Sequence, residues 1–292
     1  MSRALLQSGI ELEYDTIGSP DDEALLLVMG FTAQLTAWPD DFCKLLADAG
    51  RFVIRYDNRD CGLSSKLDGQ LVDTMAIMTA MASGQPLPTV PYSLSDMAAD
   101  GIGLLDHLGI ERAHIAGASM GGMIVQTMAI EHPHRVRSMV SIMSTTGESH
   151  VGQAAPEVLS VLIAPPPADR EAYIASSVNS LVWQSKKYQD AERTKNEAAA
   201  NFDRMFYPEG SSRQLAAIVS SGDRAAALPG VTAPTLVIHG RDDTLITPSG
   251  GMRTAELIPG ANLLLVADMG HDLPEQLFAL VAASIATHTR LA

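Results

Sequence analysis

Short apolar runs recur along the 292-residue chain, and helix-compatible stretches separate them. Runs of this kind suit parallel strands covered on both faces, because such strands lack the polar alternation of a half-exposed sheet. Their alternation with helical patterns predicts an α/β fold with a mostly parallel, doubly wound sheet. The predicted strands cover residues 8–17, 24–30, 51–57, 113–119, 139–143, 234–240 and 262–268.

Two stretches interrupt this alternation. Residues 145–230 contain no convincing strand, and much of this stretch is polar and helix-compatible. We therefore expect a core made of residues 1–144 and 231–292, with a mainly helical cap inserted before the last two strands. The Met-rich residues 66–92 are a candidate for an additional cap segment.

Charge and targeting signals limit the function classes. The formal net charge of −14 disfavours nucleic acid and anionic membrane surfaces as partners, because both repel an acidic protein. The sequence MSRALLQSGIELEYD lacks the apolar core of a signal peptide, and no apolar run approaches the ~20 residues of a membrane helix. We expect a cytoplasmic protein without nucleic-acid or membrane partners, and we leave homo-oligomerisation open.

One serine lies between a predicted strand and a predicted helix. Gly117, Ser119 and Gly121 form the pattern G-x-S-x-G, here G-A-S-M-G. A sharp turn at this point strains the serine backbone and lifts its hydroxyl above the sheet, while the small neighbours let strand and helix approach. The N–H groups of the new helix also point towards that position. The pattern predicts that Ser119 is a nucleophile.

The serine needs a base, and in sites of this kind the acid and then the histidine follow it in the chain. His271 lies in VADMGHDLP, in the loop after the last predicted strand, so it is the expected base. The other histidines are expected in packing or surface positions: His107, His114, His132, His134, His150, His239 and His288.

The acid is expected in the loop RDDTLITP, which follows the strand 234–240. Neighbouring loop residues usually point apart, so only one of Asp242 and Asp243 can orient His271. We favour Asp243 and keep Asp242 as the alternative. Glu148, the first carboxylate after the preceding strand, is too far along its loop.

Attack on a carbonyl creates an oxyanion, which needs two fixed N–H donors. The N–H of Met120, directly after the nucleophile, is the first expected donor. The second is expected from the loop after LLLVMG, where Gly30 lets the backbone bend and Phe31 supplies its N–H.

Taken together, LLLVMGF, RYDNRDCGLSS, GASMGG, LVIHGRDD and MGHDLP resemble the α/β-hydrolase superfamily. The resemblance is greater to bacterial carboxylesterases and to the aclacinomycin methylesterase group, which have a similar V-M-G loop and R-Y-D-x-R-D-x-G-x-S segment. It implies Ser119, Asp243 and His271 as the catalytic triad. Many relatives have His-Gly before the oxyanion residue, where this chain has Met29-Gly30.

Substrate specificity is expected to depend on the cap. Large side chains there are candidates for lining a substrate pocket, although a stripe such as Met75, Met78 and Met81 more often packs against the fold or a second subunit. The candidate pocket residues are Met75, Met78, His150, Trp183 and Phe206.

The favoured function is a serine hydrolase that cleaves carboxylic esters of small-molecule substrates through an acyl-enzyme, without cofactor or metal. The same triad is compatible with perhydrolase or haloperoxidase activity, lactone opening and C–C bond hydrolysis. Two further alternatives are a non-catalytic ligand-binding protein of this fold and an interaction protein that docks through the Met-rich helix.

Overall fold

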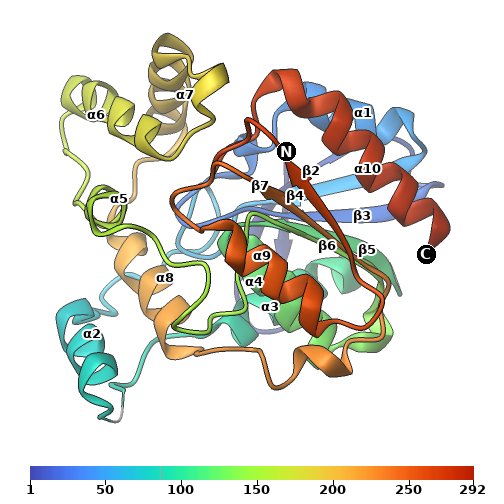
Figure 1. Cartoon of the computed structure of the whole chain (residues 1–292), viewed down its shortest axis with the longest axis horizontal. Coiled ribbons are helices and arrows are strands. Elements are labelled where there is room, and N and C mark those ends of the chain that lie inside the picture. Colours follow the sequence, from blue (N-terminus) through green and yellow to red (C-terminus); the bar gives the residue numbers. More distant parts are fainter. Residues whose placement is uncertain (86) are drawn as a thin grey trace.

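An eight-stranded sheet forms the centre of the protein in the computed structural model, which describes residues 1–85 and 87–292 (Figure 1). The strand order is β1-β2-β4-β3-β5-β6-β7-β8. The strands are β1 (Ser2–Leu5), β2 (Glu11–Ile17), β3 (Glu23–Val28), β4 (Arg51–Tyr56), β5 (Ala113–Ala118), β6 (Val136–Ile142), β7 (Thr235–Gly240) and β8 (Asn262–Val266).

Most of the sheet is parallel, as predicted. Only the pairs β1–β2 and β2–β4 are antiparallel. Every residue of β5 and β7 is buried, which explains their continuous apolar character, because helices cover both faces of the sheet. In the parallel register Val28 pairs with Gly117, so the loop after β3 lies beside the turn after β5. The register therefore brings together two loops that are about ninety residues apart in the chain.

Helices cover the two faces of the sheet in separate apolar clusters. One face packs against α1 (Asp40–Asp48) and α10 (Phe278–Leu291), through Phe42, Phe278 and Val281 among others. The other face packs against α3 (Leu94–His107) and α4 (Met120–Glu131), and α9 (Pro248–Leu257) lies over β7 and β8. The core is thus divided into two layers by the sheet.

Several helices within residues 145–230, a range that we call the cap segment, lie beside the sheet (Figure 1). The group contains α5 (Pro156–Leu162), α6 (Arg170–Ser177), α7 (Ala191–Arg204) and α8 (Glu209–Ser220). Helix α2 (Thr74–Ser83), from the Met-rich segment, packs against α8. The 3₁₀ turns are η1 (Leu35–Ala37), η2 (Pro133–Arg135), η3 (Val178–Val182), η4 (Lys186–Tyr188), η5 (Leu228–Gly230) and η6 (Glu275–Leu277).

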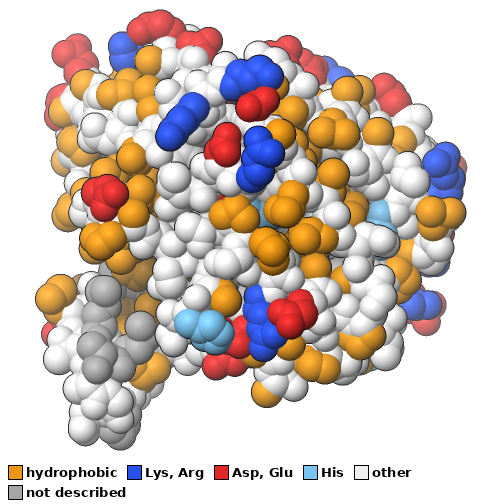
Figure 2. Space-filling model, viewed as in Figure 1, with side chains coloured by type: hydrophobic (Ala, Val, Ile, Leu, Met, Phe, Trp, Pro, Cys, Tyr) orange, Lys and Arg blue, Asp and Glu red, His pale blue; other side chains and the backbone are white. Residues whose placement is uncertain are grey.

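The surface in Figure 2 mixes apolar and charged side chains. Lys and Arg side chains on this face stand singly or beside acidic ones, and they form no continuous basic area in this view. Among the described helices, none is both long and apolar enough to cross a membrane.

Candidate active site

Ser119 occupies the turn between β5 and α4 with a strained backbone. Its φ is 57° and its ψ is −119°, a region that non-glycine residues rarely adopt. Small neighbours make this turn possible, because a Cβ on Gly117 would lie 2.1 Å from Gly121 O and one on Gly121 would lie 2.0 Å from Val28 O. Both glycines are therefore required by close backbone contacts, as the G-x-S-x-G pattern predicts.

Ser119, His271 and Asp243 come together at the carboxyl edge of the sheet. Nε2 of His271 lies 2.9 Å from Oγ of Ser119, and Nδ1 of His271 lies 2.7 Å from Oδ2 of Asp243. This arrangement fits a neutral imidazole whose Nδ1–H donates to Asp243 and whose Nε2 accepts the hydroxyl hydrogen. This geometry would allow His271 to take the proton of the Ser119 hydroxyl while Asp243 orients the imidazole.

Asp243 is buried and held by several donors. Its Oδ1 accepts hydrogen bonds of 2.9 Å from each of the backbone N–H groups of Leu245 and Ile246. Burial acts to raise the pKa of Asp243, but the charge of His271 and the side chains of His239 and His271 outweigh it and lower the pKa to about 2. Asp242 is half-buried and its side chain makes no hydrogen bond to His271. Of the two candidates, Asp243 is the one placed to orient the base.

The loop that carries His271 packs closely against the cap segment. The N–H of His271 donates to Trp183 O at 2.7 Å, and the N–H of Gly270 donates to Ser185 Oγ at 2.8 Å. A Cβ at Gly270 would lie 2.5 Å from Trp183 O, so glycine is needed here. Ser185 in turn hydrogen-bonds to Asp272. We did not predict the roles of Gly270 and Ser185, because their contact joins segments far apart in the chain.

Among the hydrogen bonds of the described residues, none has the backbone N–H of Phe31 or Met120 as its donor. Met120 is the first residue of α4, where the opening N–H groups of a helix have no partner inside the helix. The loop of Phe31 reaches the site through Gly30, whose Cβ, if present, would lie 3.0 Å from Ser119 Cβ. Both amides therefore remain candidates for the two oxyanion donors.

A cavity of about 580 Å³ opens above Ser119, between the core and the cap segment. Its size suits a small organic molecule. The core contributes Phe31, Trp38, Ser119, Ile142, Leu245 and His271 to the walls, and the cap segment contributes Leu162, Trp183, Arg193, Glu197, Asn201 and Arg204.

Among the predicted pocket residues, Trp183 lies in the cavity wall and three others do not. Met75 is 71% exposed, because the buried face of α2 carries Ile77 instead. His150 is exposed and lies beside Glu148. Phe206 packs against Tyr173 and Phe202 within the cap segment. These three residues lie outside the wall of this cavity, since size and apolar character do not reveal which way a side chain points.

Met78, the fifth predicted pocket residue, has a side chain that lies outside the described residues. Among the described residues, no group of three or more His, Cys, Asp or Glu side chains is placed to hold a metal ion.

The chain belongs to the α/β hydrolase fold family, whose profile matches residues 23–276. It is 28% identical to the rhodomycin D methylesterase DauP of Streptomyces sp. (strain C5), over 100% of this chain and 99% of that relative. It is also 28% identical to the putative carbamate hydrolase RutD of Variovorax paradoxus (strain S110), over 89% of each chain. The enol-lactonase of Burkholderia xenovorans LB400 has a similar structure, with a TM-score of 0.73, 20% identity and coverage of 99% and 100%.

Proposed function

We propose that the protein is a serine hydrolase that cleaves carboxylic esters through an acyl-enzyme. The hydrogen-bonded series Ser119–His271–Asp243 supports this proposal, because it places an activated hydroxyl under a cavity of substrate size. The full-length similarity to a rhodomycin D methylesterase supports an ester as the substrate class. The cap segment, residues 145–230, covers the bound acyl or alcohol group in this proposal.

In the proposed mechanism the hydroxyl of Ser119 attacks the ester carbonyl and passes its proton to Nε2 of His271. Asp243 stays ionised, consistent with a lowered pKa of about 2, and stabilises the imidazolium that forms. The N–H groups of Phe31 and Met120 hold the oxyanion of the tetrahedral intermediate. Collapse of this intermediate breaks the ester C–O bond, and the alkoxide leaves with the proton from His271. Water then attacks the acyl-enzyme by the same route and releases the acid.

The test is hydrolysis of p-nitrophenyl esters from acetate to decanoate, with Ser119→Ala as the matched variant. We expect wild-type turnover and a loss of several orders of magnitude in the variant, as for other triad serines. A fluorophosphonate probe should label Ser119 in the wild type only, as read by peptide mass spectrometry. Turnover that persists in Ser119→Ala would reject the proposal.

Carbamates are a second candidate substrate class, because a relative that aligns with 89% of this chain is named a putative carbamate hydrolase. The chemical steps would be the same, with attack at the carbamate carbonyl. Rates on matched p-nitrophenyl acetate, a lactone and a p-nitrophenyl carbamate distinguish the classes. We expect the ester to have the highest kcat/KM.

A further inference from the structure

The loop that carries Phe31 is held by cap residues from both sides. On one side, the backbone N–H of Thr32 donates to Oε1 of Gln214 at 2.8 Å. Thr32 has a φ of 57°, so its backbone needs external support to keep this conformation. Gln214 lies on α8, is fully buried, and also donates from Nε2 to Arg59 O at 2.9 Å. One amide group thus joins the loop, α8 and the loop after β4.

Helix α8, which carries Gln214, is itself held against the core. The guanidinium of Arg213 makes two hydrogen bonds of 2.8 Å to the carboxylate of Asp60, and both side chains are buried. A Cβ on Gly210 would lie 2.1 Å from Asp60 O, which shows how closely α8 approaches the core. Helix α8 therefore cannot move away from the core, and carry Gln214 away from Thr32, without breaking a buried ion pair.

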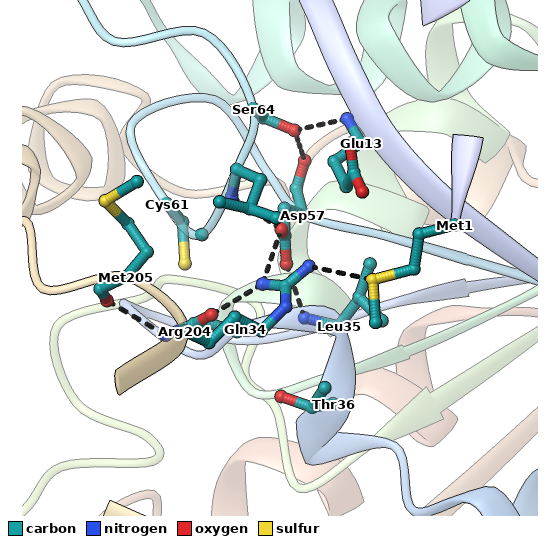
Figure 3. Close-up of polar contacts among 12 residues, drawn as sticks. Met1, Glu13, Gln34, Leu35, Thr36, Asp57, Cys61, Ser64, Arg204 and Met205 are labelled. Carbon is teal, nitrogen blue, oxygen red and sulfur yellow. Dashed lines mark hydrogen bonds and ion pairs between the residues drawn. The ribbon is translucent and has the colours of Figure 1, made fainter. Parts of the chain in front are cut away.

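On the other side, the end of α7 is joined to the same loop through Gln34 (Figure 3). Nε2 of Gln34 donates to Asn201 O at 2.7 Å and to Met205 O at 3.1 Å, and so satisfies carbonyl groups at the end of the helix. Arg204 donates to Oε1 of Gln34 at 2.5 Å. The same guanidinium lies 2.8 Å from Oδ2 of the fully buried Asp57.

Asp57 completes the connection to the loop. Its Oδ1 accepts a hydrogen bond of 2.7 Å from the backbone N–H of Leu35, and Figure 3 shows Asp57 and Gln34 facing the guanidinium of Arg204. Residues 32, 34 and 35 are thus each anchored, directly or through Asp57, to a cap helix.

We propose that Gln214 and Gln34 are positioning residues for the oxyanion hole, which the cap helices α7 and α8 hold in its reactive shape through the bonds of these residues to the loop of Phe31. This inference rests on the proposed esterase function. Neither residue touches the reacting atoms. Without these bonds the loop relaxes at Thr32, and the Phe31 N–H no longer points at the developing oxyanion.

The test uses Gln214→Met, which keeps the side-chain volume and removes both hydrogen bonds. Its matched control is Gln126→Met, because Gln126 is equally buried and hydrogen-bonded but lies within α4, away from the loop. On p-nitrophenyl acetate we expect kcat to fall at least tenfold in Gln214→Met, since loss of a complete oxyanion donor lowers kcat about 10²–10³-fold. We expect KM to change less than threefold, and kcat of the control to change less than threefold.

A second readout separates positioning from a general loss of stability. The ketone 1,1,1-trifluoro-2-hexanone forms a hemiketal with an active serine and places its oxyanion in the hole. Its inhibition constant should weaken by the same factor as kcat in Gln214→Met and stay unchanged in Gln126→Met. In Gln214→Glu a carboxyl oxygen can still accept the hydrogen bond from the N–H of Thr32, so kcat should exceed that of Gln214→Met.

Gln34→Met and Arg204→Met test the α7 side in the same assays, with Arg170→Met as control. Arg170 pairs with Asp203 between α6 and α7 and does not contact the loop. If Gln214→Met does not fold, these variants decide the question. An unchanged kcat, or a rise in KM alone, in the folded variants of Gln214 and Gln34 would overturn the inference. An inactive wild type would instead overturn the esterase proposal, so the two failures are distinguishable.

Discussion

Nδ1 of His271 and Oδ2 of Asp243 lie 2.7 Å apart, and both residues sit in loops that follow neighbouring parallel strands, β8 and β7. The contact gives the imidazole one favoured tautomer and orientation. The backbone N–H groups of Leu245 and Ile246 hold the Asp243 carboxylate in this position, whereas the side chain of the neighbouring Asp242 makes no hydrogen bond to His271.

Asp243→Asn should therefore reduce activity far more than Asp242→Asn. An amide can hold His271 in the wrong tautomer, and in another enzyme with this triad such a change lowers kcat about 10⁴-fold. We expect a loss of at least a hundredfold in kcat for Asp243→Asn and less than threefold for Asp242→Asn on p-nitrophenyl acetate. Equal losses in the two variants would mean that the acid is wrongly assigned.

The low pKa of Asp243 makes stability depend on pH in one direction. Because its pKa is about 2 in the folded protein and higher in the unfolded chain, the stabilisation is complete above about pH 5 and decreases as the pH falls towards 2. The low pKa of Asp243 contributes about 2 kcal/mol to the free energy of unfolding at neutral pH, and about 1 kcal/mol of this is lost at pH 3. Urea unfolding of wild type and Asp243→Asn at pH 7 and pH 3 measures this contribution. The difference in free energy of unfolding between wild type and variant should be smaller at pH 3 than at pH 7. A difference that stays constant or grows would contradict the assignment.

Gly121→Ala should disrupt the site because its Cβ meets rigid backbone, at 2.0 Å from Val28 O. Either β3 or the start of α4 must shift, which changes the distance between the two proposed oxyanion donors. We expect a loss of stability of about 1–3 kcal/mol and at least a tenfold fall in kcat. Gly230→Ala is the control, because Gly230 has open space around its Cβ position and no positive φ. Thermal unfolding and ester turnover test both variants, and similar behaviour of the two would rule out the steric explanation.

Trp183 and Phe206 should differ in their effects on specificity. Trp183 lines the cavity, so Trp183→Ala should enlarge it and move the preferred acyl chain to a longer ester, with about 1–3 kcal/mol of change in relative kcat/KM. Phe206 stacks on Phe202 within the cap segment, so Phe206→Ala should lower stability by about 1–3 kcal/mol and leave the preferred chain length unchanged. The p-nitrophenyl ester series and thermal unfolding measure these effects. A shifted preference in Phe206→Ala alone would reverse our assignment of the pocket wall.

Local sequence patterns were enough to predict much of the fold. Apolar runs located six of the strands, and the alternation of apolar and polar residues over 8–17 located β2. Strand β1 was missed because Ser2–Leu5 is short and mostly exposed, and its pairing with β2 gives it strand geometry. Strand β6 begins at Val136, three residues before the predicted start at 139. The apolar pattern did not reveal these residues, because Arg137 and Ser138 are polar.

The sequence by itself determined the strand–helix order, the strained turn at Ser119 and the placement of Asp243 and His271 in the loops after two strands. Each of these follows from local chemistry, because glycine spacing and apolar periodicity act over a few residues. Only the tertiary structure decided which side chains line the cavity and how Gln34 and Gln214 hold the loop of Phe31. Thr32 and Gln214 are 182 positions apart, and no local pattern encodes a contact that depends on how whole helices pack.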